Sequence, residues 1–414
     1  MSKVDELADE DQRLLWPLVD KISHSSFALR QLAAVRILMG VALFGLLVRN
    51  FPYRHELYGP DGYYSFELWK AMQGTSGVFG WSSSELWFEF LYALAIVVSV
   101  ALIIGWRTRL VSAVFCLIVV GLHARLFVGL SGGDMILRIT SLLLPFTNCG
   151  AAWSLDARRR RRKGDEPDLT GRILLAVSGL ALVAMSFQGY YSWKYFLALW
   201  LLWAAHPLAY VLRGSASWSA VFNRISNLAS NSVLVLIGAQ LCVVYLAASW
   251  YKIQHPEWQD GTGVYWSMLG DDHYNSWPEL SEFLARSPIV ILILTWGTVL
   301  LQCAFPFALF SRKVKNVLLI LLLGEHIGIG VMMALPFFSI QVIAADMVFV
   351  STAWMLYVER YAGIGYAAVA ARAPSRLRKR KAGVPKSGKP AKAAGDGAGD
   401  AASNPEAVPA EVAN

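Results

Sequence analysis

The sequence predicts an all-α protein, a bundle of helices that crosses a lipid bilayer many times. Of the 414 residues, 56% are hydrophobic and 16% are charged, whereas a soluble domain is about 45–50% apolar and about a quarter charged. The apolar residues gather in blocks of roughly 17–24, and a helix of that length spans the ~30 Å hydrocarbon core. Because lipid offers the backbone no hydrogen-bond partners, such blocks cross it as helices. The predicted fold class is therefore a polytopic transmembrane helical bundle.

About ten spans are expected from the lengths of these blocks. They lie near residues 27–49, 87–105, 109–128, 134–150, 172–189, 195–212, 231–250, 287–309, 316–335 and 340–358. Residues 1–26 lack a basic start followed by a short apolar core, so we expect a cytoplasmic segment there and not a cleaved signal. The transmembrane domain is thus predicted to cover residues 27–358.

The basic residues predict how the spans are oriented. Short loops that carry Lys and Arg normally stay in the cytoplasm. With ten spans drawn, every basic stretch falls on one side and both termini are cytoplasmic; these stretches are 106–109, 157–163, the linker with Arg213 and Arg224, 311–315 and 376–381. The sequence therefore predicts a multi-pass protein of the cell membrane.

The C-terminal region, residues 359–414, is predicted to be a cytoplasmic link followed by a disordered tail. From Arg372 onward the chain is rich in Ala, Lys, Gly and Pro and has little apolar surface to bury. Nine Lys and Arg stand there against four Asp and Glu, a balance that favours contact with anionic lipid. One short basic run on a membrane-bound chain is not typical of nucleic-acid binding, and no such partner is expected.

The four cysteines give no sign of a disulfide framework or a metal site. Cys116, Cys149, Cys242 and Cys303 lie within or at the ends of the expected spans, with no paired spacing in an outer loop. Structural zinc sites and disulfide scaffolds both show paired spacings. No metal is therefore expected.

One outward segment, SWYKIQHPEWQDGT, holds the first candidate residues. Lys252 and His255 lie there between Trp250 and Trp258, directly after a long apolar block. A lysine at a helix end usually extends its charge to the membrane surface among interfacial aromatic residues. Alternatively, a lysine acts as a base near neutral pH when an apolar cavity lowers its pKa. Spacing alone leaves both interpretations open.

Charged residues inside the expected spans are the second candidate set, because each is costly at mid-bilayer unless it is paired or hydrated. Asp134 and Arg138 are four residues apart, hence on one helix face, and can form a structural pair. Glu325 and His326 indicate a cavity or a proton path, or else a histidine bonded to a neighbouring helix carbonyl. The other members of the set are Arg36, His123 and Arg125.

Several segments resemble, in order, the HTTM superfamily of membrane proteins related to vitamin K-dependent γ-carboxylase. The most diagnostic is VYLAASWYKIQHPEWQDGTGVYW, residues 244–266. The others are ALRQLAAVRILMGVALFGLLVRN with YGPDG (28–50, 58–62), GGDMILRITSLLLPF with WSLD (132–146, 153–156) and EHIGIGVMMALPFFSIQVIAADMVF (325–349). Residues 165–230, with two of the expected spans, look like an insertion relative to this family.

The resemblance implies a membrane enzyme that uses a lipid-soluble quinol of the menaquinone or vitamin K type, a lyase-like carboxylase. Lys252 would be the base, and the outward-facing pocket would also hold His255, Asp134 and Glu325, with His326 beside them. Trp250, Trp258 and His123 would contact the cofactor. The carboxylase carries a histidine near the position of Gly133 and Asp134, which this chain lacks.

Two other function classes remain open at this point. Bacterial members of the family are linked to a sporulation-delaying toxin, which implies a non-enzymatic role in maturation or export of, or immunity to, a secreted peptide. A transporter is the third possibility, with Asp134, Arg138 and Glu325 as a proton or substrate path. No inverted repeat with paired broken spans supports it.

Overall fold

The structure, a computed structural model, describes residues 17, 19–73, 77–126, 129–163, 169–186, six positions between 197 and 208, 215–269 and 277–361. Residues 1–357 form one compact unit, and residues 358–414 form a second, described only as far as Tyr361. Every regular element among the described residues is helical, which confirms the all-α class.

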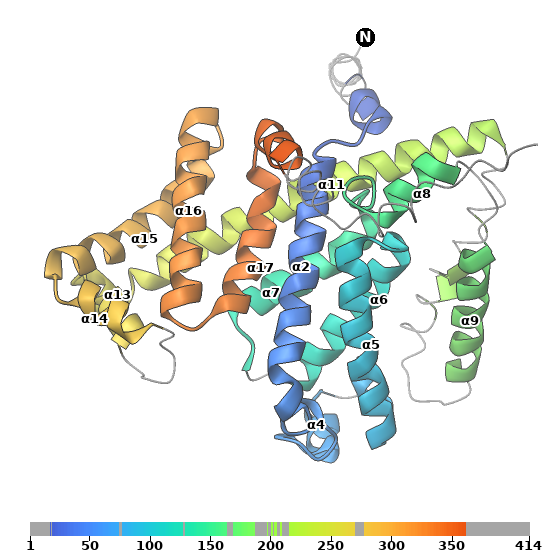
Figure 1. The fold of residues 1–414 in the computed structure, drawn as a ribbon, viewed down its shortest axis with the longest axis horizontal. Helices are drawn as coiled ribbons and strands as arrows, with labels where there is room; N and C mark the ends of the chain where they lie inside the picture. Colours follow the sequence, from blue (N-terminus) through green and yellow to red (C-terminus); the bar gives the residue numbers. More distant parts are fainter. Residues whose placement is uncertain are drawn as a thin grey trace, which may run out of the picture. The chain divides into compact units, whose positions relative to one another are not determined.

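The long helices account for most of the fold (Figure 1). They are α2 (Leu29–Asn50), α5 (Glu85–Ile104), α6 (Thr108–Arg125), α7 (Gly132–Leu143), α9 (Leu169–Ser186), α11 (Ala216–Lys252), α15 (Pro288–Ala308), α16 (Arg312–Met332) and α17 (Pro336–Asp346). The shorter ones are η1 (Phe51–Tyr53), α3 (Arg54–Tyr58), α4 (Phe66–Gln73), η2 (Val78–Gly80), η4 (Leu144–Phe146), α8 (Leu155–Lys163), α12 (Pro256–Gln259), α13 (Gly263–Leu269), α14 (Pro278–Ala285) and η6 (Met347–Phe349).

Within the described part of the chain, six helical segments are long and apolar enough to cross a membrane, and a bent pair raises the number to seven if it forms one span. The six match the spans predicted near 27–49, 87–105, 109–128, 231–250, 287–309 and 316–335. The structure is thus compatible with a membrane protein of several spans. The six segments are Leu29–Tyr58, Glu85–Ile104, Thr108–Arg125, Ser217–Lys252, Pro288–Ala308 and Arg312–Met332.

The segment predicted to span the membrane at 134–150 is not one continuous α-helix. α7 has 12 residues and ends at Leu143, where η4 with Pro145 begins, because proline lacks the N–H that continues an α-helix. The segment still runs alongside α6 in the opposite direction. Asp134 lies near His123 at one end of α6, and Asn148 accepts a hydrogen bond from Arg109 at the other.

The span predicted at 340–358 is also broken. α17 and η6 together cover Pro336–Phe349, and the following helix, Thr352–Tyr361, is bent away from them by 115°. α17 runs antiparallel to α16, since Lys315 near the start of α16 donates to the carbonyl of Phe349. Two short helices, α7 and α17, therefore pack against each other and against longer neighbours.

Two other predicted spans reach beyond what the structure describes. The span at 172–189 coincides with α9, of which the stretch Gly171–Leu180 is apolar but shorter than a membrane crossing. Most of the span at 195–212 lies outside the described residues, as do most of residues 1–26 and the tail from residue 362.

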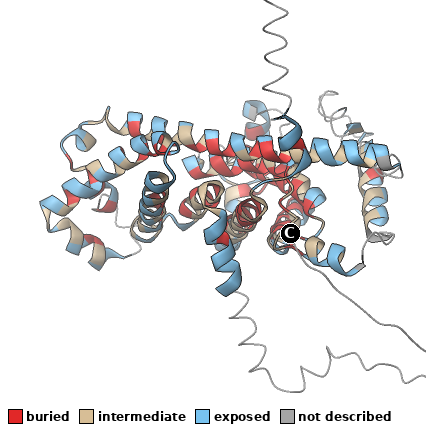
Figure 2. Ribbon diagram, turned by 90° about the horizontal axis from the view of Figure 1, so that it is seen from above, coloured by how far each residue is buried: buried red, intermediate tan, exposed pale blue. Residues whose placement is uncertain are grey.

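The core lies where α2, α5, α6, α7 and α17 pack together (Figures 1 and 2). Apolar residues such as Leu32, Leu102, Phe115 and Leu137 are fully buried there. Arg36 is also fully buried, and its guanidinium donates to the carbonyls of Leu102 (2.6 Å) and Trp153 (2.8 Å). This residue is therefore a structural cap on the end of α5, whose last carbonyls have no partners within the helix.

α11 is longer than the span predicted for it. Its 37 residues extend for about 55 Å at ~1.5 Å per residue. Polar side chains in its first half bond to the segment before α2, since Asn231 donates to the carbonyls of Ile22 and Ser25, both at 2.8 Å. The second half carries the apolar block that leads to Lys252.

Candidate functional site

Lys252 is the last residue of α11, and its ammonium group points into the protein. Nζ donates to Oε1 of Gln302 at 2.7 Å and lies 5.1 Å from the centroid of the Trp258 ring. The side chain is partly buried. A cation over an indole face gains about 0.5–2 kcal/mol, more where water is excluded. The sequence left open a lysine exposed at the membrane surface, and the structure instead gives this group protein partners.

Gln302 connects Lys252 to Glu325. Its amide nitrogen donates to Oε1 of Glu325 at 2.5 Å, while its amide oxygen accepts from the lysine. Gln302 is 4% exposed, so the amide is fixed within the packing of α11, α15 and α16. The second oxygen of Glu325, Oε2, is buried and has no hydrogen-bond partner among the described residues. We call these three residues the Lys–Gln–Glu chain.

A pocket of about 320 Å³ adjoins this chain. Trp258 forms part of its wall, and the same ring is the one that the ammonium of Lys252 approaches. His255 lies in the wall with its ring 4.6 Å from that of Tyr251. The full lining is Tyr251, His255, Glu257, Trp258, Gly263, Trp266 and Ser267.

A tight turn after Trp258 fixes this wall. The carboxylate of Asp260 accepts from the backbone N–H of Thr262 at 2.9 Å and from its hydroxyl at 2.7 Å. These hydrogen bonds to the charged form hold the pKa of Asp260 below its usual value. Gly261 has φ +85°, and a Cβ there would lie 2.3 Å from a methyl of Leu292, so only glycine fits without strain.

His123 and Asp134 form a separate cluster with Gln341. Oδ1 of Asp134 lies 4.0 Å from Nε2 of His123 and accepts from the Gln341 amide at 3.1 Å. Neither ring nitrogen of the buried His123 has a hydrogen-bond partner in the described part of the chain. The ion pairs found among the described residues do not join Asp134 to Arg138, which is exposed.

The structure thus divides the expected site. It brings Lys252, Glu325 and Trp258 together and places His255 in the adjoining pocket. It leaves His123 and Asp134 in their own cluster, and no hydrogen bond or ion pair described here links the two sets. Trp250 is 66% exposed and does not line the pocket.

The sequence did not predict Gln302 or Gln341 in these two clusters, nor Tyr245 and Asp346, whose hydroxyl and carboxylate are bonded to each other. All four side chains are buried on helices that are otherwise apolar. The signal that could have found them is the one that found Glu325, a polar side chain inside an apolar block. Asp346 is charged and carries that signal in full, whereas the other three are uncharged.

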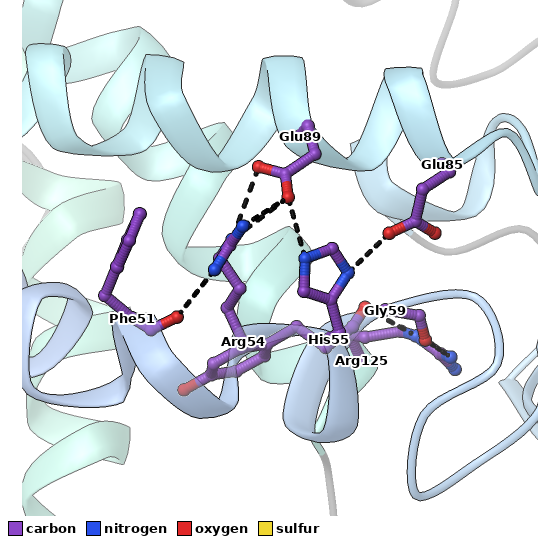
Figure 3. Close-up of polar contacts among 8 residues, drawn as sticks. Phe51, Arg54, His55, Gly59, Glu85, Glu89 and Arg125 are labelled. Atoms are coloured by element: carbon purple, nitrogen blue, oxygen red, sulfur yellow. Dashed lines mark hydrogen bonds and ion pairs between the residues drawn. The ribbon is translucent and has the colours of Figure 1, made fainter.

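A further polar cluster lies at the first loop (Figure 3). His55 faces two carboxylates, with Nδ1 on Glu85 and Nε2 at 2.8 Å from Glu89. Ligand atoms of these three residues lie within 4.8 Å of one another, a set able to hold a metal ion that the sequence did not predict. However, Arg54 also binds Glu89 at 2.8 Å. Its charge already compensates that carboxylate, and the cluster works as a clamp between the loop and α5.

Comparisons with known proteins leave the family open. No protein-family model matches the chain, and no solved structure matches it. Over 110 residues it is 34% identical to an uncharacterized protein, YitO, of Bacillus subtilis (strain 168). The aligned part is 25% of this chain and 35% of that protein, so the chain covers about a third of this relative's length.

Proposed function

We propose that this chain is a multi-pass protein of the cell membrane, with cytoplasmic termini, that performs quinol-dependent acid–base chemistry at the Lys–Gln–Glu chain. The class of reaction is the one implied by the resemblance to the HTTM superfamily, a carboxylase-like lyase. The observation that carries the proposal is the enclosed Lys252–Gln302–Glu325 hydrogen-bonded chain beside an aromatic-walled pocket. Buried ionisable groups inside membrane helices usually mark function.

The pocket offers aromatic and polar side chains to the ring and the hydroxyl groups of a quinol headgroup. Its volume of about 320 Å³ is at the lower end of the ~300–1,000 Å³ typical of small-molecule sites. Trp258, Trp266 and Tyr251 supply apolar walls, and His255 supplies a polar group at the rim. Glu257 and Ser267 are further polar residues in its wall. These residues would hold a quinol, which when bound supplies reducing equivalents.

Each side chain of the site would then have a different role. Lys252 would accept a proton at Nζ in its uncharged amine form. Gln302 positions that amine, because its amide is held on the other side by Glu325. Trp258, which contacts Nζ and also lines the pocket, would connect the base to the bound ligand.

The test replaces the lysine without changing its length. In Lys252→Met, a quinol-dependent reaction of the purified protein should fall by about 10²–10⁴-fold, the usual contribution of a positioned base. Bound menaquinone-type quinol should still be extracted from the purified variant. Lys313→Met removes an exposed lysine on α16 and is the matched control. Unchanged turnover in Lys252→Met would contradict the proposal. So would purified wild-type protein that contains no bound quinol.

A further inference from the structure

Asp346 is a fully buried carboxyl group that the Lys–Gln–Glu chain does not use. It lies at the end of α17 with 0% exposure. The hydroxyl of Tyr245, on α11, donates to it at 2.7 Å and 2.9 Å from its two oxygens. The same hydroxyl lies 3.4 Å from Nε2 of His326, on α16. One phenol therefore bridges a carboxyl group and an imidazole.

No cation balances this carboxyl group among the described residues. The titratable groups that face it are Tyr245 and Cys242 from α11 and Glu325 and His326 from α16. The described contacts of α2 and α7 bring no titratable group to it, since Arg36 bonds to backbone carbonyls and Asp134 to Gln341. Lys315 bonds to the Phe349 carbonyl. A buried charge without a counterion is unfavourable, and such a group takes up a proton instead.

Aromatic rings enclose the three residues. The imidazole of His326 stacks on Tyr245 with ring centroids 6.1 Å apart and planes at 29°. Phe305 meets Tyr245 edge-on at 5.7 Å, and Phe338 lies 6.0 Å from His326. Water is therefore excluded, which strengthens each polar interaction inside.

We propose that Tyr245, His326 and Asp346 form a proton-binding site in the interior of the bundle, in which a proton is shared between the carboxyl group and the imidazole through the phenol. In one state Asp346 is protonated and His326 is neutral. In the other, the carboxyl O–H bond breaks as its proton joins the phenol oxygen, and the phenol's own proton forms the N–H bond at Nε2. A carboxylate and an imidazolium result, and no electrons are transferred.

A second nitrogen of the His326 ring could exchange a proton with another group. Nδ1 of His326 is buried and has no hydrogen-bond partner in the part of the molecule that is described. The preceding residue is Glu325, the inner member of the Lys–Gln–Glu chain. The proton-binding site thus adjoins the Lys–Gln–Glu chain through the neighbouring residues Glu325 and His326. The site does not depend on any quinol reaction.

Infrared difference spectroscopy on the full-length protein in lipid nanodiscs tests this site. Wild-type protein near neutral pH should show the C=O band of a buried protonated carboxyl group, and Asp346→Asn should lose it. Asp260→Asn, which removes an exposed carboxyl group, should keep it. Tyr245→Phe should move the band to higher frequency, because the carboxyl group loses its hydrogen bond to the phenol, whereas Tyr251→Phe at an exposed tyrosine should not.

The outcomes that overturn the proposal are equally specific. A monodisperse, helical Asp346→Asn protein that keeps the band refutes it, since the band then belongs to another carboxyl group. If Asp346→Asn does not fold, Tyr245→Phe decides alone, because it removes a single oxygen atom. A band that is absent from the wild type, or that stays in place in Tyr245→Phe, also refutes the shared proton.

Discussion

Asp260 shows how a single exposed carboxylate shapes the candidate pocket. Its two hydrogen bonds from Thr262 keep the turn after Trp258 closed and hold its pKa below the usual value. Since the folded pKa is depressed, this contribution is fully present above the ordinary pKa of an aspartate. It is lost as the pH falls through the lowered value. The turn should therefore loosen only under acidic conditions.

Hydrogen exchange measures this loosening directly. The protection factor of the Thr262 amide, corrected for the intrinsic pH dependence of exchange, should be constant near neutral pH and fall in acid. In Asp260→Asn the side-chain oxygen stays but no longer titrates, so the acid-dependent fall should disappear. A fall that persists unchanged in Asp260→Asn would show that another group controls the turn.

Single residues also show what the sequence could and could not predict about the site. Lys252 stood out because it follows a long apolar block between two tryptophans, and Glu325 because a charge inside an apolar block is costly. The structure places both in one hydrogen-bonded chain. Their link, Gln302, is uncharged and gave no comparable signal. Asp134 was expected to face the same pocket. Its position follows instead from the way α7 packs against α6 and α17, which no local pattern encodes.

At the scale of elements, the start of α7 depends on a capping box. The Ser131 hydroxyl accepts from the Asp134 N–H at 3.2 Å, and the Asp134 carboxylate accepts from the Ser131 N–H at 2.8 Å. Each bond satisfies a backbone donor that the helix itself leaves free. Asp134 thus has a structural role in addition to its contact with His123.

Ser131→Ala should therefore destabilise the protein by about 1 kcal/mol, the usual cost of losing such a cap. Thermal unfolding of detergent-solubilised protein, followed by circular dichroism, should show a lower Tm than wild type. Ser83→Ala, at an exposed serine in the loop before α5, is the control and should leave Tm unchanged. Equal Tm values for Ser131→Ala and wild type would mean that the cap adds nothing to stability.

Elements also explain why two of the expected spans are not straight, continuous helices. Composition shows that residues 134–150 and 340–358 are apolar, and the prediction of a straight helix rests on that property alone. Pro145 ends α7 early, and this local signal was available in the sequence. The bend after η6 has no such marker. The Gln31 side chain there donates to the carbonyl of Val350 at 2.9 Å, a contact 319 residues distant in the chain.

At the scale of the whole molecule, burial differs between helices in the way a lipid-facing bundle requires. The apolar windows of α2 and α6 are 61% and 67% buried, whereas those of α15 and α16 are 28% and 17% buried. Exposed Ile, Leu and Val side chains cover the outer faces of α15 and α16. In water such a surface would aggregate, so a bilayer is the environment that these two helices fit.

The proposed orientation can be tested on the entire chain with single cysteines. The loops before α5 and after α11 are expected outside, and the basic α8 and the α15–α16 turn inside. After replacement of the four native cysteines, Ser83→Cys and Glu257→Cys should react with a membrane-impermeant maleimide in intact cells. Arg158→Cys and Ser311→Cys should react only after permeabilisation. All four positions are exposed in the structure. A position that is not labelled in intact cells is therefore shielded by the membrane and not by burial in the protein. Labelling of positions 83 and 158 from the same side would contradict an odd number of crossings by the three segments between them, α5, α6 and α7 with η4. Labelling of 257 and 311 from the same side would contradict the crossing of α15.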